Sequence, residues 1–114
     1  MALPELIHTI VESKLKAYCE KRVPPEVRDR VRLGYKFRGD SVTLFEERHS
    51  FAESDAWVEI PAAQFRFNVG LQMWTLYCAD RNSRWHKYWE VEPDKNFENL
   101  LREVDKDPTG IFWG

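Results

Sequence analysis

The chain has 114 residues, of which 43% are hydrophobic and 14% aromatic, and its formal net charge is −2. A chain of this length typically buries about two-thirds of its unfolded surface on folding, so we expect a single domain over residues 1–114. The near-neutral charge excludes a global positive field that would draw the whole protein onto nucleic acid or an anionic membrane. Any such binding must come from a local patch.

The amino-terminal segment and the two cysteines bear on location and cofactors. No apolar run approaches the roughly 20 residues of a membrane-spanning helix, and acidic residues interrupt the apolar pattern near the amino terminus. We therefore expect a cytoplasmic protein with no membrane partner. Cys19 and Cys78 lie far apart in sequence, and no histidine or cysteine spacing matches a metal motif. The pattern predicts free, buried or half-buried thiols, no metal and no cofactor.

The first predicted element is an amphipathic helix from Pro4 to about Arg22. Its apolar residues recur at helical spacing, and its charged residues lie off that stripe. The paired prolines Pro24 and Pro25 end this helix, because each lacks a backbone donor and biases its predecessor away from helix. At most a single helical turn is expected between Glu26 and Arg30.

From Arg32 the apolar period changes to two, which predicts a hairpin of two strands joined at Gly39-Asp40. Three more alternating runs follow, beginning at residues 57, 72 and 84, with turn-forming residues between them. Pro61 is expected to split or bend the third strand, because proline cannot donate to a ladder. The sequence thus predicts five strands in meander order.

The last predicted element is a second helix after Pro93, capped by Asp94 or Asn96. The terminal residues 111–113 are large and apolar, and leaving each in water costs about 1.5–3 kcal/mol, so we expect this end to dock. Strands followed by a helix, not alternating with helices, favour an α+β fold. The prediction is an antiparallel meander sheet of about five strands with an N-terminal and a C-terminal helix packed on one face.

The densest cluster of chemically versatile side chains is the stretch "RWHKYWEV" at residues 84–91. Strand parity predicts that Trp85 and Lys87 face the core with Trp89 and Val91, and that the alternate residues face outward. If the other strands are neighbours, a candidate surface forms from Glu46, Arg48, Arg66, Arg84, His86 and Tyr88. It is either a recognition surface, with stacking, anion pairing and a pH-sensitive imidazole, or a solvated face of weak cross-strand charge pairs.

Charge is distributed unevenly along the chain. Residues 12–32 hold seven basic and four acidic residues, whereas residues 90–107 hold three basic and seven acidic residues. The opposite charges of the two helical regions therefore either attract each other within the molecule, or the first region leaves a basic edge that could bind nucleic-acid phosphates. That candidate basic edge consists of Arg22, Arg28, Arg30 and Arg32.

Five segments in order along the chain resemble the bacterial domain-of-unknown-function family number 3024. They are "LGY" at 33–35, "SVTLFEER" at 41–48, "PAAQFRF" at 61–67, "RWHKY" at 84–88 and "VDKDPTGIFWG" at 104–114. The resemblance implies a small, single-domain cytosolic protein. It brings no assigned activity, substrate, cofactor or catalytic residue.

Three functional hypotheses follow from these patterns. The leading one is a non-enzymatic interaction domain that binds a macromolecular partner, nucleic acid or another protein, through the exposed sheet face or the basic edge. The second is a small enzyme with Glu46 and His86 as acid and base and Arg48 holding an anion, which requires these groups to converge in a cleft. The third is a homodimer formed through the sheet face, so monomer and homodimer both stay open.

Overall fold

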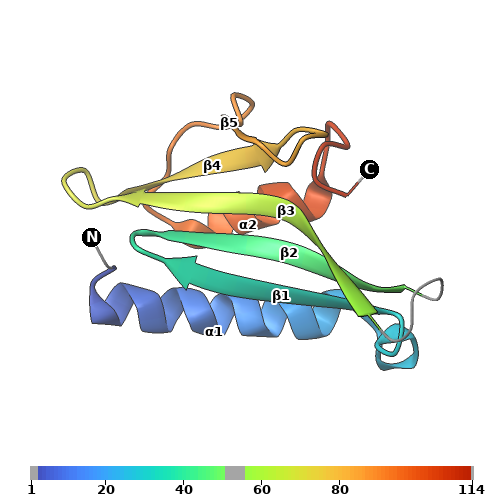
Figure 1. Ribbon diagram of the computed structural model, residues 1–114. Coiled ribbons are helices and arrows are strands. Elements are labelled where there is room, and N and C mark those ends of the chain that lie inside the picture. Colours follow the sequence, from blue (N-terminus) through green and yellow to red (C-terminus); the bar gives the residue numbers. More distant parts are fainter. Residues whose placement is uncertain (1–2, 51–55, 114) are drawn as a thin grey trace.

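The computed structural model describes residues 3–50 and 56–113. Its elements in chain order are α1 (Glu5–Arg22), the 3₁₀ turn η1 (Pro25–Val27), β1 (Val31–Arg38), β2 (Ser41–Ser50), β3 (Ala56–Asn68), β4 (Met73–Ala79), β5 (Trp85–Lys87) and α2 (Phe97–Lys106). The five strands form one antiparallel sheet in the order β1-β2-β3-β4-β5 (Figure 1). The predicted α+β meander is confirmed.

Both helices pack on the same face of this sheet, α1 beside β1 and α2 against β4 (Figure 1). The core lies between them and the inward side chains of the strands. Its fully buried large members are Val11, Leu15, Val42, Leu44, Phe65, Leu76, Leu100 and Val104. The opposite, outer face of the sheet is covered by no helix or strand of the described chain. None of the described helices is long and apolar enough to cross a bilayer.

The β1–β2 hairpin forms as predicted around a two-residue loop in which Gly39 has a φ of 60°. Such loops require a residue that tolerates positive φ, and glycine does so without steric cost. The loop pairs Arg38 with Ser41, and this register directs Tyr35 and Phe37 toward the core. The hairpin therefore fixes which side chains of β1 and β2 face inward.

Pro61 does not split β3, but the strand is irregular beside it. Leu44 pairs with Ala63 and Phe45 pairs with Pro61, so Ala62 is an extra residue that makes a β-bulge. Beyond the bulge, Val58 and Ile60 share the helix side of the sheet with Arg48 and are 50% and 43% exposed. The helices thus leave this end of their own face partly open.

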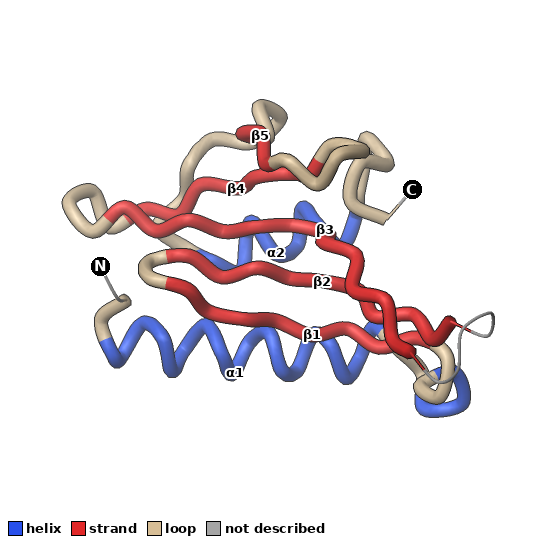
Figure 2. Tube along the Cα trace, viewed as in Figure 1, coloured by secondary structure: helices blue, strands red, loops and turns tan. Residues whose placement is uncertain are grey.

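The prediction for the fifth strand was wrong in length and in parity. β5 covers only Trp85–Lys87 (Figure 2), and Lys87 pairs with the outward Tyr77. Tyr88 is 4% exposed, whereas Trp89 is 78% exposed. The physical reason lies in the neighbours: the ring of Phe112 packs on Tyr88, with ring centroids 4.9 Å apart. In a short edge strand, such tertiary contacts decide which side chains face the core more than the alternation of apolar and polar residues does.

The carboxyl-terminal segment docks through Phe112 and Trp113 as predicted, whereas Ile111 stays 47% exposed. Asn96 caps α2 by accepting a hydrogen bond from the backbone N–H of Glu98 (3.0 Å). Asp107 ends the helix in the left-handed region, and its carboxylate accepts hydrogen bonds from the backbone N–H groups of Phe112 and Trp113 (3.0 and 2.9 Å). Phe112 is thereby held in the core and Trp113 at the end of α1.

The two cysteines are free thiols, as predicted. Cys78 is buried and Cys19 is half-buried. Burial raises the pKa of Cys19 to about 11. Burial also raises the pKa of Cys78, so both thiols are protonated and weakly reactive near neutral pH.

Candidate functional site

The six residues of the predicted candidate surface do not converge on one face. Glu46 and Arg48 lie on the helix side of the sheet, at the open end of β2. Arg66 lies on the outer face of β3. Tyr88 is buried, and its hydroxyl donates to a carboxylate oxygen of Glu103 (3.1 Å). The surface expected from strand parity therefore divides into separate regions.

His86 and Arg84 belong to a local turn around Asp80. One carboxylate oxygen of Asp80 accepts the backbone N–H groups of Asn82 and Arg84 (2.8 and 2.9 Å), and the other lies 2.7 Å from Nε2 of His86. These hydrogen bonds lower the pKa of Asp80 to about 2, and the backbone N–H of Arg84 contributes most. The arrangement orders the β4–β5 turn.

The acid–base pair required by the enzyme hypothesis is not assembled. Glu46 is on β2 and His86 is on β5, with β3 and β4 between them. At about 4.8 Å per strand, the two backbones are on the order of 14 Å apart. Glu46 bonds to Arg48, and His86 bonds to Asp80. The geometry gives no support to catalysis by these two groups.

The predicted basic edge also divides. Arg28 turns inward and donates to the backbone carbonyls of Val23 (3.1 Å) and Glu20 (2.8 Å), where it caps the end of α1. Arg32 lies on the outer face with its guanidinium 3.8 Å from the ring centroid of Trp57. The other two arginines, Arg22 and Arg30, border a cleft on the helix side.

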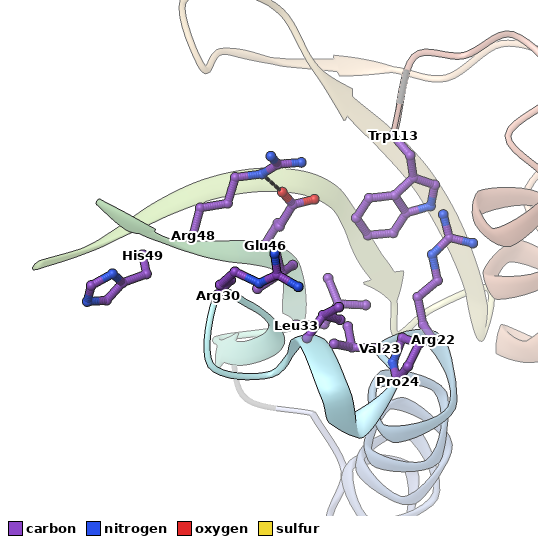
Figure 3. Close-up of a pocket in the computed structure, with 11 residues that line it drawn as sticks. Arg22, Val23, Pro24, Arg30, Leu33, Glu46, Arg48, His49 and Trp113 are labelled. Atoms are coloured by element: carbon purple, nitrogen blue, oxygen red, sulfur yellow. Dashed lines mark hydrogen bonds and ion pairs between the residues drawn. The ribbon is translucent and has the colours of Figure 1, made fainter. Parts of the chain in front are cut away.

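The cleft lies where the end of α1, η1, the open end of β1 and β2, and the carboxyl-terminal segment meet (Figure 3). Its volume is about 620 Å³. Three arginines line it, Arg22, Arg30 and Arg48, together with Glu46 and the ring of Trp113. Figure 3 shows Glu46 and Arg48 bonded at one side and Arg22 beside Trp113 at the other. The cleft thus brings together two residues of the predicted candidate surface, Glu46 and Arg48, and two of the predicted basic edge, Arg22 and Arg30.

On the outer face, one row of side chains crosses all five strands. Directly paired positions place Lys36 of β1 beside Thr43, Thr43 beside Gln64, Gln64 beside Tyr77, and Tyr77 beside Lys87 of β5. The amide of Gln64 donates to the hydroxyl of Thr43 (3.0 Å). We call these five residues the cross-strand row. Their side chains are polar, cationic or aromatic, and none is fully buried.

Cations lie over aromatic rings along this row. The guanidinium of Arg66 is 3.8 Å from the ring centroid of Tyr77, and its Nε donates to Gln64 (2.7 Å). The ammonium of Lys87 is 4.4 Å from the centroid of Trp89. A guanidinium held flat on a ring keeps its remaining N–H donors and its second face available. Lys36 at the other end of the row is paired with Glu59 (2.7 Å), so the pre-arranged stacking surface and cationic donors lie at the Tyr77 end, with Arg66 and Lys87.

The outer face carries charge opposite to that of the whole chain. Five of its side chains are cationic and two are acidic. The cations are Arg32, Lys36, Arg38, Arg66 and Lys87, and the acids are Glu47 and Glu59. Because the chain as a whole has a net charge of −2, this face is the local positive patch that the composition required for binding polyanions.

No three His, Cys, Asp or Glu side chains within residues 3–50 and 56–113 gather as a metal site requires. The fold and its surfaces define a single-sheet α+β domain with one uncovered cationic and aromatic face. The sequence model of a domain of unknown function, DUF3024, matches residues 3–114, so the chain belongs to this family. Comparisons with curated proteins and with solved structures give no match.

Sequence reasoning missed most of the cross-strand row and the role of Trp113 in the cleft. The two-residue loop at Gly39 does specify that Lys36 pairs with Thr43, so the first two members of the row were within reach. The others depend on the bulge at Ala62; the expectation that Pro61 would split or bend the strand indicated an irregularity here but not this register. The meeting of Arg22 with Trp113 joins segments from opposite ends of the chain.

Proposed function

We propose that this protein is a bacterial, cytoplasmic interaction domain that binds single-stranded nucleic acid on the outer face of its sheet. The observation that carries the proposal is the cross-strand row, in which Tyr77 with the guanidinium of Arg66 over its ring forms a stacking surface beside the cation Lys87. Single strands are bound by aromatic side chains on which bases stack, within a positively charged surface that follows the phosphates.

The dimensions of the row suit a short stretch of unpaired nucleotides. Four gaps between five strands, at about 4.8 Å each, give a span of about 19 Å. Open sheets that bind RNA stack two or three bases across such a span. Stacking on one aromatic ring contributes about 1–3 kcal/mol per base, so even one or two rings supply useful affinity.

The same features disfavour a duplex as the ligand. Paired bases are stacked inside the helix and cannot lie on Tyr77 or on the guanidinium of Arg66, so a duplex would contact only the cations. The two acidic residues of the face, Glu47 and Glu59, lie toward the β1–β3 end. The Tyr77 end of the row therefore has the more favourable potential for a phosphate backbone.

The test is fluorescence anisotropy with labelled single strands of about eight nucleotides, as RNA and as DNA, and with a duplex of the same sequence. Titrations at about 20 mM and about 150 mM salt give the salt dependence. We expect single strands to bind more tightly than the duplex and binding to weaken with salt. Comparison of the RNA with the DNA then shows whether the 2′-hydroxyl contributes.

Matched variants separate the row from general electrostatics. Arg66→Ala removes the cation that lies over Tyr77 of the row, whereas Arg102→Ala removes an exposed cation from α2 on the other side of the sheet. We expect Arg66→Ala to weaken binding about tenfold and to reduce the salt slope by about 0.7, and Arg102→Ala to change neither. Tyr77→Leu should weaken binding by a similar factor, while Tyr77→Phe keeps the ring and most of the affinity.

Equal losses for Arg66→Ala and Arg102→Ala would contradict the proposal, because binding would then follow total charge only. Absence of binding at low salt would also contradict it, since electrostatic attraction is strongest there. Binding of an acidic protein on the same face, with no affinity for either single strand, would assign the row to a different partner.

A further inference from the structure

The cleft at the end of α1 lies on the opposite side of the sheet from the cross-strand row and has a different construction. Its floor is apolar and includes Val23, Val31 and Leu33, and the ring of Trp113 forms one wall. Binding sites for small molecules commonly enclose about 300–1,000 Å³, with apolar walls and a few orientated polar groups. A volume of about 620 Å³ with three arginines at its border fits that description.

The wall formed by Trp113 and Arg22 is held in place from behind. The indole Nε1 of Trp113 donates to the backbone carbonyl of Val104 (3.0 Å), which fixes the plane of the ring. The guanidinium of Arg22 lies 4.8 Å from the centroid of that ring and bonds to Asp105 (3.1 Å). A ligand ring packing against Trp113 would therefore meet a surface that does not need to be ordered on binding.

The polar side of the cleft is formed by Arg48 and Arg30. Arg48 is orientated by a hydrogen-bonded ion pair with Glu46, and Glu46 is only 17% exposed. Arg30 has an ion pair with its sequence neighbour Asp29 at 3.8 Å, and both side chains are more than half exposed. Figure 3 shows Arg30 directed toward the middle of the cleft, between Arg48 and Arg22. Guanidinium groups in this arrangement match the forked oxygens of a phosphate or carboxylate.

The end of α1 would ordinarily oppose an anion, because a helix carboxyl terminus carries partial negative charge. Here Arg28 donates to the backbone carbonyls of Glu20 and Val23 and compensates that charge. Among the residues that line the cleft, three are cationic and Glu46 is the one acid. Arg22 and Arg30 also pair with Asp105 and Asp29, which lie outside the lining. The cleft therefore favours an anion mainly at its Arg30 and Arg48 side, where both side chains are more than half exposed.

We infer that this cleft binds a small organic anion, in which a phosphate or carboxylate meets Arg30 and Arg48 while an aromatic or apolar body packs on Trp113 and Leu33. The inference goes beyond the proposed nucleic-acid binding and does not depend on it, because the two surfaces are on opposite sides of the sheet. Glu46 has a defined part in it. Its carboxylate competes with the ligand for Arg48, so the cleft exchanges one anion for another.

The test uses nuclear magnetic resonance of the 15N-labelled full chain, following the indole N–H signal of Trp113, which Trp113→Phe assigns. The probes are phenyl phosphate, benzoate, benzyl alcohol and inorganic phosphate. We expect phenyl phosphate or benzoate to bind at least about tenfold more tightly than benzyl alcohol or inorganic phosphate, as measured from the shift of the Trp113 signal. The reason is that only these two probes combine a ring with an anion. Comparing the first two probes distinguishes phosphate from carboxylate.

Three variants of residues that line the cleft test the inference most directly. Arg30→Ala and Arg48→Ala should each weaken the preferred probe about tenfold, whereas the matched control Arg84→Ala, outside the cleft, should leave it unchanged. Glu46→Gln should tighten binding severalfold, because the competing charge is removed while a hydrogen-bond acceptor for Arg48 stays. Unchanged melting temperatures confirm that each variant is folded.

The inference is overturned if neither aromatic anion shifts the Trp113 signal, or if Arg30→Ala and Arg48→Ala bind the probe as the parent chain does. A weaker affinity in Glu46→Gln would overturn the competition between Glu46 and the ligand. Failure here is distinguishable from failure of the proposed function, because Tyr77→Leu and Arg66→Ala are expected to alter nucleic-acid binding and to leave the probe titration unchanged.

Discussion

The two faces of the sheet consist of neighbouring residues on the same strands, yet they differ in nearly every property. Phe65 is fully buried against the helices, with its ring 4.6 Å from that of Phe97, while the next residue, Arg66, is exposed on the outer face. Where the helices cover it, the inner face is apolar and closely packed, and the outer face is polar, cationic and aromatic. Stability should therefore depend mainly on the inner residues and the proposed nucleic-acid binding on the outer residues, so substitutions should separate the two.

The largest effect is expected from Phe65→Ala on the inner face. Removing a fully buried phenyl ring leaves a cavity beneath α2, and such substitutions cost about 3–5 kcal/mol of unfolding free energy. Arg66→Ala, one residue along, should change stability by less than about 0.5 kcal/mol. Urea denaturation monitored by circular dichroism measures both. Comparable losses in the two variants would show that the faces do not divide stability as described.

An intermediate effect is expected at Gly34, on the outer face of β1. A Cβ added there would lie 2.7 Å from Cζ of Phe45, whose ring covers this position. Gly34→Ala should therefore displace the ring and destabilise the protein by about 1–2 kcal/mol. The matched control is Gly70→Ala, where the nearest atom is the side-chain oxygen of Asn68 at 3.4 Å and little change is expected. Equal melting temperatures for both variants would contradict the close packing of Phe45 on β1.

The smallest effect concerns the turn at the edge of the sheet, and it depends on pH. The pKa of Asp80 is about 2 in the folded protein and 3.8 without the fold, so its stabilising contribution is present above about pH 4 and is lost as the pH falls toward 2. Asp80→Asn should be less stable than the parent at pH 7, and the difference should shrink toward pH 2. Thermal unfolding across this range checks the sign. A difference that grows on acidification would rule out this role for Asp80.

Much of the fold could be predicted from local signals. The two-residue loop at Gly39 determines the register of β1 and β2, and Asn96 marks the start of α2 because its side chain satisfies a free N–H. Both signals act over a few residues, so the sequence displays them directly. The docking of the apolar terminus was likewise predictable, because leaving the side chains of Phe112 and Trp113 in water would cost free energy.

The site was less accessible because it depends on register across several strands. The bulge at Ala62 changes the parity within β3, so that Glu59 before it and Arg66 after it both face outward. Simple alternation cannot place both on one face. In β5 the packing of Phe112 decides that Tyr88 is buried, and this contact joins residues far apart in the chain. The predicted role of the six surface residues and of the basic edge stays a prediction.

The most direct measurement uses the five tryptophan indole N–H signals as reporters of the separate regions. Trp57 and Trp85 lie on the outer face, Trp89 beside Lys87, Trp74 in the core and Trp113 in the cleft. On addition of a single-stranded RNA of about eight nucleotides, we predict that the signals of Trp85 and Trp89 shift most and that those of Trp74 and Trp113 stay in place. A shift confined to Trp113, or no shift in any outer-face signal at low salt, would contradict the assignment of nucleic-acid binding to the outer face.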